Sequence, residues 1–547
     1  MNPEQKLSHH SESAQVASLQ TSLSADQAIF NRITKSAGVV AFFTMLSRFA
    51  GLARDMVTFH FFGANATTDA FFVAFTIPNI LRRFVAEGAL TVAFIPVYSE
   101  VRRNEGDKAA LQFYAAVLGL LLVTLALLVL GGVTFASYLV YAFASGFAEH
   151  PEQMQIATWL TRFMFPYVFF ISLVALCMGV LNSHRHFAVP AASPILLNLA
   201  MIGCTYGLIS RFSEPIWALA IGVILGGILQ LLIQIPALYR YGLLVLPSFQ
   251  WNTKPVKKLV RIMFPALFGI AVYQLNLIIL RQLGSYLPAG QISYYYNADR
   301  LMQLALGIFS ISIATAALPM MSEQTAQGDR AGLMRTWLFS TKLTNFITIP
   351  AAWGLMLIGI PIVSTLYLHG QYHWADVQLT AYATMAFAPG LISIAVSRTA
   401  IQVFFALEDL RTSVITGAVT VVVNLILGIL LLRFEVVGLA WSLTLSSWFQ
   451  TIILVIWLKL RMGKLGLRSL LSSMMKQTCL AAFSTVTAWL ICLNADWSLG
   501  PTLWNVGMLV LAIGSAMFLY AFGAILLKYE EALLLKSILH SRIKKFL

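Results

Sequence analysis

The chain has 547 residues, of which 59% are hydrophobic and only 11% are charged, and its mean hydropathy is +0.79. A soluble domain carries about 25% charged residues, so this composition excludes a soluble globular protein and indicates a membrane protein. The formal net charge of +14 would also be typical of a nucleic-acid-binding protein. The placement of the basic residues, described below, explains the charge by membrane topology instead, and nucleic acid is not an expected partner.

Residues 1–33 are polar and contain no apolar core, so they are predicted to form a cytoplasmic tail and not a signal peptide. Apolar runs of about 20 residues follow, each long enough to cross a hydrocarbon core of about 30 Å. They predict about fourteen membrane-spanning helices, at roughly 34–60, 68–98, 110–140, 156–181, 190–210, 215–238, 259–286, 291–321, 334–359, 377–406, 411–432, 436–459, 472–494 and 501–527. The final segment, 528–547, is amphipathic and basic and is predicted to lie on the inner membrane surface. The expected fold is an all-α polytopic membrane protein.

The loops between these runs decide the orientation. With the N-terminus inside, nearly all loop lysines and arginines fall on the inner side, and only Arg211 and Arg433 fall in outer loops. Such a bias follows the positive-inside rule. Both termini are therefore predicted to be cytoplasmic.

An internal repeat relates two stretches about 223 residues apart. Ala93–Ala109 reads AFIPVYSEVRRNEGDKA and Ala316–Ala331 reads AALPMMSEQTAQGDRA. Weaker matches at a similar offset pair Pro166 with Pro389 and Asn198 with Asn424. Their common order along the chain makes coincidence a poor explanation.

The repeat predicts an N-lobe at 34–240 and a C-lobe at 255–460, each with six helices, followed by helices thirteen and fourteen at 470–527. Six spans return the chain to its starting side, so the two lobes have parallel topology. Two such lobes around a central cavity are typical of a transporter that works by alternating access.

Five arginines interrupt the apolar runs: Arg48, Arg54, Arg82, Arg83 and Arg300. A basic residue at the centre of a membrane helix costs about 2.5–3.5 kcal/mol on insertion scales. These arginines therefore require water, counter-charges or an anionic ligand.

Four carboxylates are available in the same spans, namely Asp55, Asp69, Glu87 and Asp299. Arg83 and Glu87 are four residues apart and can pair within a helix, and Arg48 shares a helix face with Asp55, seven residues away. The plainer alternative is that all these charges pair and simply hold the lobes together. Asp69 lies at the outer end of its span, however, so the carboxylates do not balance the arginines.

The central face is thus predicted to be net positive and suited to an anion. Arginine binds phosphate particularly well, through its planar fork of donors. Arg48, Arg54, Arg82 and Arg300 are the predicted binding residues.

Other features carry less chemistry. Arg162 and Arg281 lie near outer helix ends, where their guanidinium groups are expected to reach the interface, and Arg398 in the tenth span has no assigned role. No hydrolytic triad, phosphate-binding loop or metal-spaced cluster occurs, and the four cysteines lie in apolar runs. We therefore expect neither an enzyme nor a metal or organic cofactor.

A family resemblance adds to this reading. The segment Ser47–Glu100 contains SRFAGLARD, the run FGANATTDAFFVAF, IPNILRR and AEGA, and Tyr294–Met302 reads YYYNADRLM. These motifs resemble the N-terminal and helix-eight signatures of the MurJ (MviN) lipid II flippases, and the resemblance covers nearly all of the chain after residue 30.

The resemblance implies a member of the multidrug/oligosaccharidyl-lipid/polysaccharide exporter superfamily in the bacterial cytoplasmic (inner) membrane. Its cargo would be lipid II, the undecaprenyl-pyrophosphate-linked precursor of peptidoglycan, carried from the inner to the outer leaflet, with the last two helices forming a groove for the lipid tail. Motif matching places the four binding arginines at the family's cavity positions. It also places Asp69 and Glu87 at the family's functional acidic positions. The full set of predicted supporting or gating residues is Asp55, Asp69, Glu87, Asp299, Ser47 and Asn79. Lipid II, membrane lipids and other cell-wall synthesis proteins are the implied partners.

The sequence departs from the family pattern at Thr76, where many members carry a basic residue, and at Gln303, where many carry an acidic one. The seventh and eleventh spans contain no Asp or Glu, so the family's sodium site is not implied and the coupling ion is left open. Membrane potential is the expected driving force.

Three alternatives remain at this point. A cation-coupled drug exporter of the same superfamily should present carboxylates, not arginines, to its cargo. A flippase for another polyprenyl-linked sugar would have a similar composition, and only the signature motifs argue against it. A scaffold for cell-wall enzymes would tolerate the loss of Arg54, Arg82 or Arg300.

Overall fold

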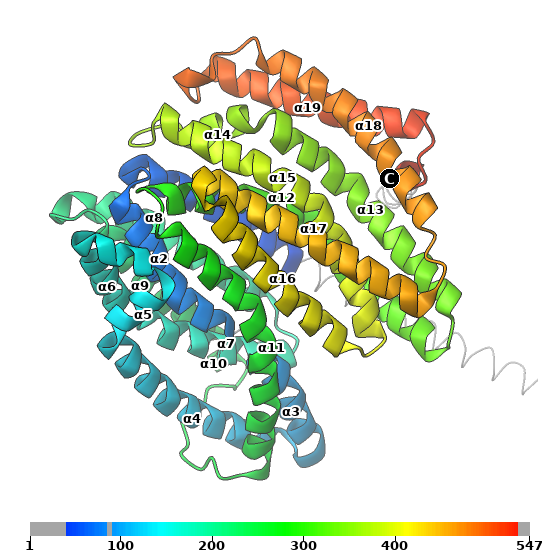
Figure 1. Ribbon diagram of the computed structural model, residues 1–547. Coiled ribbons are helices and arrows are strands. Elements are labelled where there is room, and N and C mark those ends of the chain that lie inside the picture. The colour runs from blue at the N-terminus through cyan, green and yellow to red at the C-terminus, as the bar shows by residue number, and fades with distance from the viewer. Residues whose placement is uncertain (1–39, 85–89, 534–547) are drawn as a thin grey trace, which may run out of the picture.

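The structure is a computed structural model that describes residues 40–84 and 90–533 (Figure 1). These residues form helices and no strand, which confirms the all-α prediction. The helices of the first half are 40–62, α2 (Ala66–Arg82), α3 (Leu90–Glu105), α4 (Asp107–Thr134), α5 (Ala136–Phe143), α6 (Pro151–Met164), α7 (Tyr167–Ser183), α8 (Ala188–Leu208), α9 (Trp217–Leu232) and α10 (Gln234–Arg240). The second half contains α11 (Lys254–Gly284), α12 (Gln291–Ala326), α13 (Arg330–Leu357), α14 (Gly359–Tyr367), α15 (Trp374–Ala406), α16 (Leu410–Leu431), α17 (Glu435–Met462), α18 (Leu467–Cys492) and α19 (Leu503–Leu526).

Short polar side chains begin several of these helices. Asn65 accepts a hydrogen bond from the Thr68 amide at the start of α2, and Asp409 does the same for the Thr412 amide at the start of α16. Such caps satisfy amides that have no partner within the helix. The turns are therefore fixed locally, while the long apolar stretches between them continue as helix.

Seven helical segments in the described part of the chain are long and apolar enough to cross a membrane. The pair α13 and α14, bent by 76°, would be an eighth. A polytopic membrane protein is thus confirmed, whereas the number fourteen stays a prediction. Pro166 lies between α6 and α7, so the fourth predicted span is broken there, while α15 continues through Pro389.

The helices of the first half gather on one side of the molecule and α12–α17 on the other (Figure 1). Between the halves, α11 packs against α3, and α12 packs against α2. The last two helices lie along the outside of the second half, where α18 packs against α13 and α19 against α14. This arrangement is compatible with the predicted boundaries at 34–240, 255–460 and 470–527, which remain predictions.

Two asparagines that the repeat aligns make similar contacts. Asn198 Nδ2 on α8 donates to the Ser47 carbonyl oxygen at 3.3 Å, and Asn424 Nδ2 on α16 donates to Asn276 Oδ1 on α11 at 2.5 Å. In each half, a buried amide therefore links the fifth predicted span to the first.

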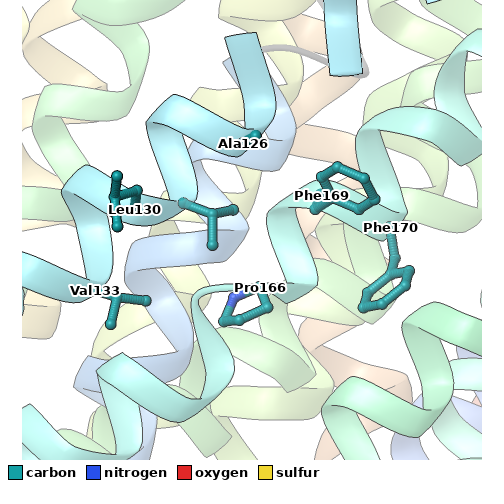
Figure 2. Close-up of a pocket in the computed structure, with 7 residues that line it drawn as sticks. Ala126, Leu130, Val133, Pro166, Phe169 and Phe170 are labelled. Carbon is teal, nitrogen blue, oxygen red and sulfur yellow. The ribbon is translucent and has the colours of Figure 1, made fainter. Parts of the chain in front are cut away.

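Two apolar pockets open on the surface of the bundle. One, of about 410 Å³, lies between α4 and the break at Pro166, with Phe169 and Phe170 on its far wall (Figure 2). The other, of about 520 Å³, lies at α16 and α17 near Phe434 and Trp441. Neither contains a predicted binding arginine, so these pockets do not test the predicted central cavity.

Candidate functional site

One carboxylate joins the first helix to α12. Asp55, only 1% exposed, accepts hydrogen bonds at Oδ1 from Arg54 Nη2 at 2.5 Å and at Oδ2 from Arg300 Nε at 2.9 Å. The Tyr296 hydroxyl accepts from Arg54 Nη2 at 2.8 Å and lies 3.3 Å from Asp55 Oδ1. Three of the four groups are charged, and their hydrogen bonds are of the strong, charge-assisted type.

Two glycines allow the arginines to cross between these helices. The Arg48 guanidinium lies directly against Gly307 of α12, and the Arg300 guanidinium lies against Gly51 of the first helix. A side-chain carbon at either glycine would overlap the guanidinium. The contact is thus reciprocal, with an arginine from each helix resting on a glycine of the other.

Several arginine side chains lie near the contact between the first helix and α12. Arg48 is half-buried, and its electrostatic neighbours are Arg300 and Arg398 of α15. Arg398, which had no role from sequence, therefore belongs to the same cluster. Like charges from three helices repel one another, and Asp55 offsets only that of Arg300. An anion or water beside Arg48 would reduce the remaining repulsion.

Arg82 and Arg83 make hydrogen bonds of their own on α2 and α11. Arg82 Nε donates to Asn79 Oδ1 at 2.8 Å on the same helix, and Arg83 Nη1 lies 3.5 Å from Gln274 Oε1 on α11. Glu87, the expected partner of Arg83, lies outside the described residues. The structure thus places Arg48, Arg54 and Arg300 around the Asp55 contact and Arg82 on α2.

Arg48 and Asp55, which the alternative of full charge pairing would join, do not bond each other. Asp55 bonds Arg54 and Arg300, whereas Arg48 extends to Gly307. The seven-residue spacing placed both side chains on one helix face, but the neighbouring helix supplied closer partners for each.

Asp299 is half-buried on α12 and accepts a hydrogen bond from Gln303 Nε2 at 2.6 Å. Its electrostatic neighbours are Arg281, Arg300 and Arg83. The sequence predicted that Arg281 reaches the membrane interface. Instead it lies 6.0 Å from the centre of the Tyr296 ring and reaches the Ile292 carbonyl, because the end of α11 packs against the start of α12.

A second carboxylate bridges the boundary between the first helix with α2 and the second half of the chain. We call this boundary the seam, and the carboxylate lies at the helix ends that the sequence predicts to face outward. Asp69, 2% exposed on α2, accepts hydrogen bonds from the Gly290 amide at 2.7 Å, the Ser293 amide at 2.8 Å and the Ser293 hydroxyl at 2.6 Å. These groups form the first turn of α12, where free amides and the helix dipole favour an anion. We call the contacts of Asp69 with α12 the outer clasp.

The outer end of the first helix also touches the loop between α14 and α15. The Gln371 amide donates to the His60 carbonyl oxygen at 2.9 Å, and Gly370, at a left-handed φ of 65°, lies against the same oxygen. The imidazoles of His60 and His369 meet at 3.2 Å. Together with the outer clasp, these contacts close the outer half of the seam between the first helix with α2 and the second half of the chain.

No group of three or more metal-ligating side chains occurs among the described residues. What the arrangement offers is a closed outer seam held by carboxylates and, next to it, a group of half-buried arginines. An all-helical membrane bundle with such a seam defines a polytopic membrane protein of the transporter class.

Comparison with known proteins gives the family. The family model described as lipid II flippase MurJ matches residues 59–507. A probable lipid II flippase MurJ of Vibrio cholerae is 34% identical over 434 residues, covering 78% of this chain and 83% of its own length. The lipid II flippase MurJ of Burkholderia cenocepacia is 36% identical over 379 residues, covering 69% and 73% respectively. The chain belongs to the MurJ family of lipid II flippases, which are transporters and not enzymes.

Solved structures agree on the fold. A lipid II flippase MurJ in an inward closed conformation has a TM-score of 0.75 at 23% identity, over 89% of this chain and 99% of that one. An inward-facing multidrug transporter of the MATE family, in the MOP superfamily, has a TM-score of 0.64 at 13% identity, over 79% and 99%. At these identities the likeness concerns the fold alone.

Proposed function

We propose that this chain moves lipid II from the inner to the outer leaflet of the bacterial cytoplasmic membrane by alternating access. The pyrophosphate binds Arg48, Arg54, Arg82 and Arg300, and both termini lie in the cytoplasm. The family membership supports the cargo, and the seam contacts support an outer-closed state that faces inward.

The proposal rests mainly on the charge of the side chains near Arg48. Its electrostatic neighbours Arg300 and Arg398 have the same sign, and each sits on a different helix. A pyrophosphate offers negative oxygens that several arginine forks can bind at once, whereas a cationic drug would be repelled.

The lipid tail is proposed to stay beside α18 and α19, outside the main bundle. Phe483 of α18 and Phe518 of α19 are exposed to 64% and 66%, which suits contact with acyl chains in the membrane. The head group can then cross inside the protein while the tail remains in lipid.

Membrane potential is the proposed driving force. Outward movement of an anion is favoured by an inside-negative potential, by about 2.3 kcal/mol per charge per 100 mV. Unchanged flipping in cells whose potential has been collapsed would contradict this part of the proposal.

The test of function is complementation of flippase-depleted cells, read out by labelling lipid II in the outer leaflet. Arg48→Ala and Arg300→Ala should insert normally and lose labelling, while Arg433→Ala, at an exposed outer position, should behave as the parent. Full activity of the first two variants would favour a scaffold. Rescue of another polyprenyl-linked sugar pathway without lipid II labelling would favour the related flippase.

A further inference from the structure

The contact between His60 and His369 connects two separate parts of the outer seam. His60 lies near the end of the first helix, and His369 lies in the loop between α14 and α15. Their Nδ1 atoms are 3.2 Å apart, the ring centres are 5.1 Å apart, and both side chains are half-buried. Solvent protons from the outer side can therefore reach the pair.

The hydrogen-bond partners assign the protons. His369 Nε2 lies 2.9 Å from the Leu366 carbonyl oxygen, which can only accept, so this nitrogen carries a hydrogen. In a neutral ring, His369 Nδ1 is then an acceptor, and His60 Nδ1 must donate to it.

Adding protons changes this contact in two steps. With one extra proton, the pair still has one N–H between the two Nδ1 atoms. With two, both Nδ1 atoms carry hydrogen and both rings are positive, so the hydrogen bond is lost and the charges repel. Only the doubly protonated pair is incompatible with the closed seam.

The backbone keeps the rings from moving apart while the seam is closed. The amide of Gln371 is bonded to the His60 carbonyl at 2.9 Å, and Gly370 packs against that carbonyl because it has no side chain. The repulsion between two charged rings is thus relieved only if the loop and the first helix separate.

The carboxylates of the surrounding helices are engaged elsewhere. Asp69 of α2 bonds the start of α12, and Asp376 of α15 bonds the His373 amide at 2.7 Å and the Tyr294 hydroxyl at 2.5 Å. Within the described ranges, His60 is the one charged or titratable side chain that acts on His369. His373, in the same loop, is exposed.

We propose that His60 and His369 form a proton-sensitive latch, which opens the outer seam when both rings are protonated from the outer side. The latch rests on alternating access but not on the nature of the cargo. It adds an external control to the seam: acid outside favours the outer-open state.

The burial of His369 decides in which direction the latch responds to pH. Burial lowers the pKa of His369 in the closed seam below its ordinary value, and an opened, solvated ring would return to about 6.5. The open state therefore binds protons more tightly. The closed state is favoured above this value and loses that advantage as the pH falls through about 6.5 and below.

Distance measurement by electron spin resonance tests the latch in the full chain in lipid nanodiscs. Spin labels at Ser213→Cys and Ala289→Cys, both at exposed outer positions, report seam opening after the four native cysteines are replaced. Between pH 7.5 and 5.0 we expect the ratio of outer-open to outer-closed molecules to rise about tenfold, a change of about 1.4 kcal/mol in the free energy between the two states.

His60→Gln and His369→Gln should each abolish this pH response, because two charged rings are required. His373→Gln is the matched control and should retain it. A parent without a pH response, or single variants that keep it, would overturn the proposal. A variant that is already open at pH 7.5 and insensitive to pH supports the latch, because the contact then holds the seam.

The same measurement on Arg48→Ala, which removes no ion pair of the seam among the described residues, separates the latch from the proposed transport. A variant that has lost lipid II labelling but still opens in acid would leave the latch intact. If that variant opens in acid and also labels lipid II normally, the result counts against the proposed function alone.

Discussion

Asp55 and Arg300 are joined across the seam by a hydrogen bond of 2.9 Å, although they lie 245 residues apart in the chain. Arg54 binds the other oxygen of the same carboxylate. Asp55 thus occupies two arginines that the proposed cargo also requires. We expect the pyrophosphate to compete with Asp55 for Arg300 and so to loosen the seam when it binds.

Replacing Asp55 tests this contact. Asp55→Asn leaves Arg54 buried without its counter-charge, and breaking a buried ion pair from one side costs about 3–5 kcal/mol. We expect a lower unfolding temperature in detergent and loss of lipid II labelling. Glu214→Gln, at an exposed loop position, is the control, and an Asp55→Asn protein as stable as the parent would contradict the bridge.

The arginines should divide into two classes. Arg54 is 7% exposed and bonded to Asp55, so Arg54→Ala should destabilise the protein by a few kcal/mol. The electrostatic neighbours of Arg48 are two further arginines, Arg300 and Arg398, so Arg48→Ala should fold at least as well as the parent while losing transport. Measuring thermal unfolding together with lipid II labelling in the outer leaflet distinguishes the two classes. Equal destabilisation by the two substitutions would refute the division.

The glycine contacts should be intolerant of a single methyl group. Gly307→Ala would push the Arg48 guanidinium away from α12, and overpacking of this kind typically costs about 1–3 kcal/mol. We expect at least a tenfold loss of transport, since the arginine is displaced as well. Gly203→Ala of α8, where nothing lies within 4 Å of the added carbon, should be neutral. Normal transport by both variants would show that Arg48 does not need this position.

The outer clasp should set the balance between the two states. Asp69→Asn replaces an acceptor oxygen by an amino group facing the amides of α12 and removes the negative charge. Hydrogen bonds to charged groups contribute about 1.5–3 kcal/mol each, so the outer-open population should rise by tenfold or more. The spin-label pair described for the latch measures it. An unchanged distance distribution would mean that the clasp is not limiting.

A further pH effect is expected at the turn before α16. Hydrogen bonds from Thr412, first its hydroxyl and then its amide, and the nearby Arg461 hold the pKa of Asp409 below its usual range. A depressed carboxyl pKa stabilises the fold above the unfolded value of about 3.9, and this contribution is lost as the pH falls through the folded value. Asp409→Ala should cost about 1 kcal/mol, as other N-cap replacements do. Denaturation at pH 7 and pH 3 should show a smaller difference between parent and variant at pH 3.

Several features followed from the sequence because their causes are local. Apolar runs with basic inner loops predicted a polytopic helical protein, and the motifs around Arg48, Arg82 and Arg300 predicted its family. The repeat aligned Asn198 with Asn424, and both amides make comparable contacts.

The partners of the charges depended on the tertiary structure. The sequence allowed a pair of Arg48 with Asp55 and placed Arg281 at the membrane interface, because it indicates contacts along one helix only. The fold brings α12 against the first helix and α2, so Asp55 is shared by Arg54 and Arg300, Asp69 reaches the start of α12, and His60 meets His369. The sequence by itself determined that the protein is a polytopic helical membrane protein of this family, and it predicted an anion site at the arginines. Which carboxylate each one binds was decided by helix packing, since electrostatic attraction falls with distance and the nearest groups lie far away in the chain.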